Sequence, residues 1–221
     1  MSSIRKLASQ TVIYGLTTIL ARLLNFALTP IHTDLIPKAD YGVLSDLYSM
    51  IAFLMVILTF GMETAFFRFN QDKKYDQDKV FSHSLIFVFL MCALLLGLSI
   101  VFDDSLTRAL QYEDRGFLIH WMLAIVAMDA IAAVPFARLR ANNHPMRFLA
   151  LRLGSIGLMV LLNLFFFKVL PGMAAGADED SWLHGAASDD KFVIYVFLAN
   201  LIGNAFLMLL FLPEFLKIRW K

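Results

Sequence analysis

The sequence predicts an all-α fold, a polytopic membrane helical bundle with six transmembrane helices. Hydrophobic residues make up 59% of the 221 residues, and the mean hydropathy is +0.69. The apolar residues arrive in blocks of about twenty, the length that crosses a bilayer, and soluble domains do not have this composition. The expected spans are residues 10–31, 43–66, 83–102, 117–137, 148–169 and 192–212.

The first expected span carries an arginine near its middle. Arg22 lies about 18 Å from one end and about 14 Å from the other, too far for its head to reach water along the lipid. The polar and small residues of this span recur at spacings of four and three, which places them on one stripe of a helix. They are Thr11, Gly15, Thr18, Arg22, Asn25 and Thr29.

This stripe is interpreted as a binding surface. Ionisable groups inside a membrane mark substrate or ion paths, so the candidate substrate-binding residues are Arg22, Asn25, Thr18 and Thr29. The alternative is that Arg22 only pairs with a buried acid and holds the bundle together.

The second and fourth spans contain acidic residues. Glu63 lies about one turn from the end of the second span, where it either pairs with a nearby base such as Arg68 or faces a cavity. Asp129 lies about 13 Å from Arg138, again too deep for the surface. Asp129 is the expected partner of Arg22, and both acids are candidates for ion coupling or charge pairing.

The remaining spans carry amides or no polar chemistry. The third span has no charge and is interpreted as a lipid-facing helix. Asn163 lies in the fifth span, and Asn200 and Asn204 share one face of the sixth, so these three are candidate cavity-lining or interhelical hydrogen-bonding residues. Pro213 is expected to stop the last helix, which divides the chain into a transmembrane lobe (residues 1–212) and a cytoplasmic tail or start of an inter-lobe linker (residues 213–221).

The distribution of charge predicts the orientation. Basic residues concentrate in the N-terminal segment, in the loops after the second and fourth spans and at the C-terminus, whereas the other loops are mainly acidic. The positive-inside rule then places both termini in the cytoplasm.

No catalytic chemistry is predicted. The single cysteine, Cys92, lies in an apolar run, so neither a disulfide framework nor a cysteine metal cluster is expected. The sequence has no P-loop, zinc-protease or nucleophile-elbow motif. We therefore expect no enzyme activity, no catalytic residue, no metal and no cofactor.

Four segments resemble the sequences of a known family. They are SQTVIYGLTTILARLLNFALTPIHT, PKADYGVLSDLYSMIAFL, TFGMETAFFRF and AIAAVPFARLRANNHPMRFLALRL. Together they resemble the bacterial polysaccharide and oligosaccharide-lipid flippases of the multidrug/oligosaccharidyl-lipid/polysaccharide exporter superfamily, over most of residues 3–212. Members often have a basic residue where Asp34 stands here. Because that family has two six-helix lobes around a central cavity, the chain resembles the amino-terminal lobe.

The resemblance implies export, by flipping, of a lipid-linked polysaccharide precursor across the bacterial inner membrane. The implied cargo is an undecaprenyl-pyrophosphate-linked oligosaccharide, and the Arg22 guanidinium suits its phosphate oxygens. Asp129 would neutralise Arg22 in the empty cavity or carry a coupling ion. The expected partners are the lipid bilayer, this cargo, and a second six-helix lobe or a homodimer, with no nucleic acid.

Two other functions stay open. A cation-coupled multidrug antiporter of the same fold would depend on Asp129 or Glu63 and not on Arg22. An inactive membrane remnant or scaffold would expose its polar stripe to lipid, so it would dimerise, recruit a second lobe or be unstable.

Overall fold

The structure is built from membrane-length helices. The computed structural model describes residues 2–72, 74–176, 181–188 and 191–216, with side chains from residue 12 onward. Every element in this described part is a helix, which confirms the predicted all-α fold. Six helical segments are long and apolar enough to cross a membrane: Val12–Leu35, Lys38–Gln71, Gln77–Val101, Glu113–Ala141, Pro145–Ala175 and Phe192–Phe215.

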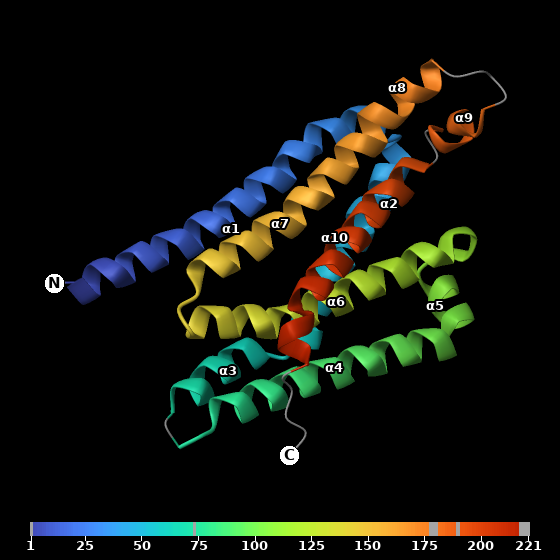
Figure 1. Cartoon of the computed structure of the whole chain (residues 1–221). Helices are drawn as coiled ribbons and strands as arrows, with labels where there is room; N and C mark the ends of the chain where they lie inside the picture. Colours follow the sequence, from blue (N-terminus) through green and yellow to red (C-terminus); the bar gives the residue numbers. More distant parts are fainter. Residues whose placement is uncertain (1, 73, 177–180, 189–190, 217–221) are drawn as a thin grey trace.

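The helices follow one another through short connections (Figure 1). They are α1 (Ser2–Leu35), α2 (Lys38–Thr59), α3 (Met62–Gln71), α4 (Gln77–Val101), α5 (Asp103–Ala109), the 3₁₀ turn η1 (Glu113–Arg115), α6 (Gly116–Ala141), α7 (Pro145–Leu164), the π-helical turn η2 (Phe165–Val169), α8 (Leu170–Ala175), α9 (Trp182–Ala186) and α10 (Phe192–Phe215). Pro37 precedes α2 and Pro145 occupies the first turn of α7, where the missing N–H of a proline has no helical partner to lose.

Helix α6 is the centre of the bundle. It packs against α2, α4 and α10, and 56% of its most apolar window is buried inside the protein, against 17% for α1. Its buried alanines, Ala127, Ala130 and Ala137, let neighbouring backbones approach closely. Helix α1 lies at the edge and packs along α7 (Figure 1). The bundle is therefore a packed core around α6 with α1 and α7 as an outer pair.

Helices α7 and α10 meet at a glycine. A Cβ atom on Gly203 would lie 3.2 Å from the backbone oxygen of Ser155 and 3.3 Å from Cβ of Met159. These distances leave no room for a side chain, so Gly203 sets how closely α10 approaches α7.

The second predicted span, residues 43–66, is not one continuous helix. Phe60 and Gly61 both adopt left-handed backbone conformations, with φ of 45° and 67°, and they separate α2 from α3. Glycine takes this conformation without steric cost, and it ends α2 as glycines commonly end helices. As a result Glu63 lies in the first turn of α3 and not at the end of α2.

Two helices also extend beyond their predicted ends. The fifth helical segment continues past residue 169 through η2 and α8 to Ala175, with Pro171 in the first turn of α8. Helix α10 does not stop at Pro213 but runs to Phe215. A proline removes only its own donor, and here the following residue, Glu214, is buried and holds the helix end in contact with two arginines.

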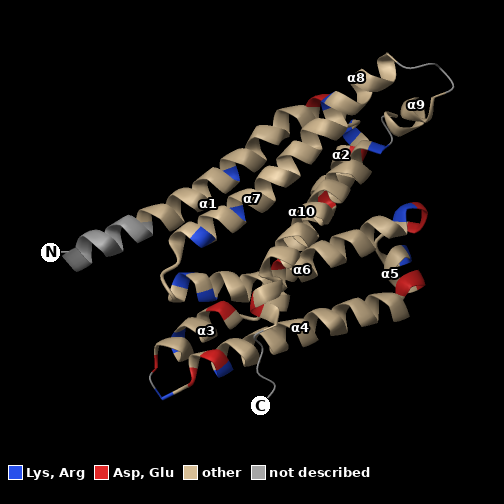
Figure 2. Ribbon diagram, in the orientation of Figure 1, with Lys and Arg blue, Asp and Glu red and all other residues tan. Residues whose placement is uncertain are grey.

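Ion pairs join the helices at one end of the bundle. Glu214 of α10 contacts Arg147 of α7 at 2.8 Å and Arg138 of α6 at 3.7 Å. Arg138 also contacts Asp78 of α4 at 2.5 Å, and its guanidinium lies 4.3 Å from the centre of the Phe81 ring. In Figure 2, charged residues gather at helix ends, and most mid-helix segments are tan. We call this end, formed by α3 and the adjoining ends of α4, α6, α7 and α10, the basic end.

The opposite end is joined by a second set of contacts, between the α5–η1 connection and α2. Arg115 contacts Asp40 at 2.5 Å, and the Tyr112 hydroxyl donates to Asp46 at 2.9 Å. Burial, followed by the hydrogen bond to Asp46 and its negative charge, raises the pKa of Tyr112 to about 12. Tyr112 therefore stays protonated and keeps donating at neutral pH.

Glu214→Gln is expected to destabilise the protein by about 1–3 kcal/mol, because it removes the buried negative charge shared by two arginines. The measurement is thermal unfolding in detergent, followed by reaction of a thiol dye with Cys92, which is 2% exposed in the fold. Glu113→Gln, at an exposed acid of η1, is the matched control and should melt with the wild type. Equal melting of the two variants would contradict a stabilising role for Glu214.

Candidate functional site

Two adjoining cavities open into the bundle between α1, α2, α6 and α7. The first has a volume of about 520 Å³ and is also lined by α10. The second has a volume of about 450 Å³ and also reaches α3. Four residues line both: Asn25, Asp129, Arg152 and Ile156. The shared lining makes them two parts of one polar site inside a membrane-length bundle.

The first cavity is lined by asparagines, and we call it the asparagine chamber. Its polar lining includes Asn25, Thr29, His32, Tyr48, Asn163, Asn200 and Asn204. Hydrogen bonds join its walls: His32 Nε2 lies 3.0 Å from the Asn163 oxygen, and the Asn200 amide donates to the Tyr48 hydroxyl at 2.5 Å. These contacts link α1 to α7 and α2 to α10. The amides thus both line the chamber and fix its walls.

The second cavity is lined by three arginines, and we call it the arginine chamber. Arg22 comes from α1, Arg140 from α6 and Arg152 from α7. Arg140 is held by Glu63 at 2.7 Å, whereas Arg22 and Arg152 have no described carboxylate within 4 Å. Three guanidinium groups face two carboxylates here, Glu63 and Asp129. The formal charge of the lining is therefore positive, which favours an anion.

Asp129 lies where the two chambers join. Its electrostatic neighbour is Arg152, and nearby the Asn204 amide donates to the backbone oxygen of Ile125 at 3.4 Å. The predicted ion pair between Asp129 and Arg22 is not found among the described residues: Arg22 forms no ion pair, and the cation that acts electrostatically on Asp129 is Arg152, which lies beyond 4 Å. The reason is geometric, because α7 packs directly against α6 and α10, while α1 reaches the core mainly through α7.

The structure brings together all the site residues predicted from the sequence. Thr18, Arg22 and Glu63 line the arginine chamber. Thr29, Asn163, Asn200 and Asn204 line the asparagine chamber. Asn25 and Asp129 line both. Glu63 was predicted either to pair with a nearby base or to face a cavity. It pairs with a base, which is Arg140 and not Arg68. The roles of these residues in binding or ion coupling stay predictions.

Charged and aromatic lining residues that were not predicted include His32, Tyr48, Arg140 and Arg152. Arg152, Ser155, Met159 and Asn163 follow one another at spacings of three and four and so share a stripe. His32 extends the α1 stripe by one further step beyond Thr29. Extending each polar stripe to the end of its helix identifies Arg152 and His32 from the sequence.

Among the described residues, no group of three or more His, Cys, Asp or Glu side chains is placed to hold a metal ion. A membrane-length helical bundle with a polar, arginine-lined cavity defines a multi-pass membrane protein with an internal site. The sequence profile of the family described as "polysaccharide biosynthesis protein" matches residues 7–176, more than half of the chain. The chain belongs to this family. Searches of curated proteins and of solved structures found no match.

If the chambers hold water, a cysteine in their lining will react with aqueous reagents. In a Cys92→Ala background, Asn25→Cys should react with a charged maleimide at least about tenfold faster than Phe26→Cys, because a thiolate forms only where water reaches it. Phe26 is the next residue of α1, 71% exposed and outside both chambers. The measurement uses protein in nanodiscs, where both faces are accessible. Equal rates would show that lipid fills the chambers.

Proposed function

We propose that this protein takes part in exporting a lipid-linked polysaccharide precursor across the bacterial inner membrane by flipping it between leaflets. The observation that carries the proposal is the arginine chamber, because two of its guanidinium groups, on Arg22 and Arg152, have no described carboxylate in contact. Membership of the polysaccharide biosynthesis family supports the choice of cargo. The proposed cargo is an oligosaccharide on undecaprenyl pyrophosphate.

The proposed mechanism begins with the pyrophosphate. Arg22 is exposed toward the arginine chamber, and a guanidinium can bind two phosphate oxygens at once. Arg152 acts electrostatically on Asp129 without an ion-pair contact, so it can contact an arriving phosphate without first breaking an ion pair. The adjoining asparagine chamber offers amide and hydroxyl groups to the polar sugar part of the cargo.

The proposed orientation places both termini in the cytoplasm, with the basic end on that side. Arg22 and Asn25 are exposed in the isolated chain, and exposed polar side chains are not stable against lipid. A second six-helix lobe, or a second copy of this chain, would cover them. Rocking of the two units about the membrane centre would then give each side access in turn.

Arg22→Ala is expected to lower export at least about tenfold, the effect of losing roughly 1.4 kcal/mol of binding to the cargo. Arg22→Lys should be intermediate, because it keeps the charge and loses the two-pronged geometry. The measurement is surface polysaccharide in a host that lacks the endogenous gene and expresses each variant at equal membrane level.

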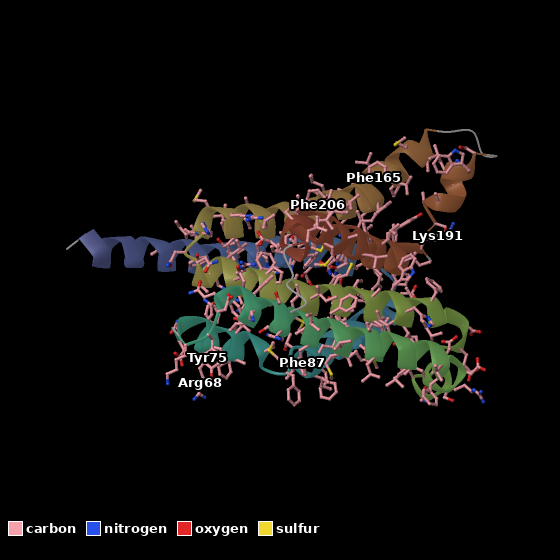
Figure 3. All side chains as sticks on the ribbon, turned by 60° about the horizontal axis from the view of Figure 1, so that its bottom comes forward. Arg68, Tyr75, Phe87, Phe165, Lys191 and Phe206 are labelled. Carbon is pink, nitrogen blue, oxygen red and sulfur yellow. The ribbon has the colours of Figure 1, made fainter. Side chains whose placement is uncertain are left out.

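Arg68→Ala is the matched control. Arg68 is exposed on α3 and points away from the bundle in Figure 3, and it lines neither chamber, so export should be unchanged. Full export with Arg22→Ala would overturn the proposal. If Asp129→Asn abolished transport while Arg22→Ala did not, the cation-coupled multidrug antiporter would be favoured, since the Asp129 carboxylate at the chamber junction could bind a cation.

A further inference from the structure

A third cavity lies on the opposite face of α2 from the two chambers. Its volume is about 410 Å³, and it is enclosed by α2, α4, α5 and α6. Its lining is almost wholly apolar, and we call it the apolar groove. Typical lining residues are Met50 and Leu54 of α2, Leu98 of α4, Leu106 of α5, Leu110 directly after α5, and Met122 of α6.

Water does not fill a groove of this composition. The polar side chain in its lining is Ser99, whose hydroxyl already donates to the backbone oxygen of Leu96 at 2.8 Å. A buried water needs two to four polar partners, and apolar cavities of about 150 Å³ stay dry and bind hydrocarbon. The groove is larger than such a cavity, and its apolar lining favours binding of an apolar molecule.

The groove opens toward the surroundings of the bundle. Phe53, Leu98 and Phe102 on its rim are 68%, 47% and 57% exposed, and two of them belong to membrane-length segments. In a membrane these side chains meet lipid, so a hydrocarbon chain reaches the groove by moving sideways out of the bilayer.

Charged residues near the groove indicate which headgroup the bound lipid would carry. Helix α5, which closes one end of the groove, carries Asp103, Asp104 and Arg108 beside the apolar Leu106. Arg108 is exposed, and its Nε donates to the backbone oxygen of Asp104 at 3.0 Å, while no described carboxylate lies within 4 Å of its guanidinium. A zwitterionic headgroup matches this pattern, with its phosphate near Arg108 and its ammonium near Asp104.

We propose that the apolar groove holds one acyl chain of a bilayer phospholipid, with the zwitterionic headgroup over α5. This lipid would fill the space between α2 and α4, which make few direct contacts along this face. The proposal goes beyond transport and does not depend on the proposed cargo.

The test is lipid retention in native mass spectrometry. The protein is reconstituted in dioleoylphosphatidylethanolamine vesicles and released, and one bound phospholipid is expected. Leu98→Trp should lose it, because the larger side chain occupies the groove. Leu94→Trp is the matched control on the same helix: Leu94 is similarly exposed, at 56%, but lies outside the groove, so the lipid should stay. If Leu98→Trp does not fold, Leu106→Trp replaces it: this variant fills the groove from α5 and should also lose the lipid.

Competition identifies the occupant. Dioleoylglycerol has the same chains without the charged headgroup and should be retained more weakly, and Arg108→Ala should remove that preference. No bound lipid on the wild type, or equal loss in Leu94→Trp and Leu98→Trp, would overturn the site. Stronger retention of undecaprenyl phosphate, or equal retention of dioleoylglycerol, would overturn the phospholipid as its occupant.

Discussion

The cost of placing charge in hydrocarbon governs this structure. A charged side chain at the bilayer centre costs about 3 kcal/mol on insertion scales, so it must face protein or water. Arg22 and Asp129 lie on helices that are otherwise strongly apolar, and both line the chambers. The arrangement of α1, α6 and α7 follows from this constraint, because their polar stripes have to meet.

The same constraint explains what could be predicted from the sequence. The depth of a residue in a span follows from counting residues, so Arg22 and Asp129 could be identified as buried in the membrane. The spacing of Thr18, Asn25 and Thr29 placed these residues on the same helix face as Arg22. The partner of Asp129 could not be found this way. It depends on how far each helix is rotated and which helices are neighbours, and tertiary packing sets both. Arg152 lies on a helix nearer to α6 than α1 is, so it is the cation beside Asp129.

Helix boundaries show a second limit of sequence reasoning. Hydropathy does not change at Phe60 or Gly61, so an apolar window passes through the break between α2 and α3 without a signal. At Pro213 the local rule predicts a stop, but the contacts of Glu214 with Arg138 and Arg147 extend the helix. A proline inside a helix costs about 3 kcal/mol, and the contacts that accompany the longer helix come from residues distant in the sequence.

Two groups of arginines near the chambers and the basic end differ in their contacts. Arg138, Arg140 and Arg147 each contact a carboxylate, and they join helices at the basic end. Arg22 and Arg152 line the chambers without such a contact among the described residues. An arginine already paired on its own protein must lose that pair before it binds an anion, whereas an unpaired one need not. In the part of the chain that the structure describes, the arginines of the first group hold one end of the bundle together, and those of the second group leave positive charge inside it.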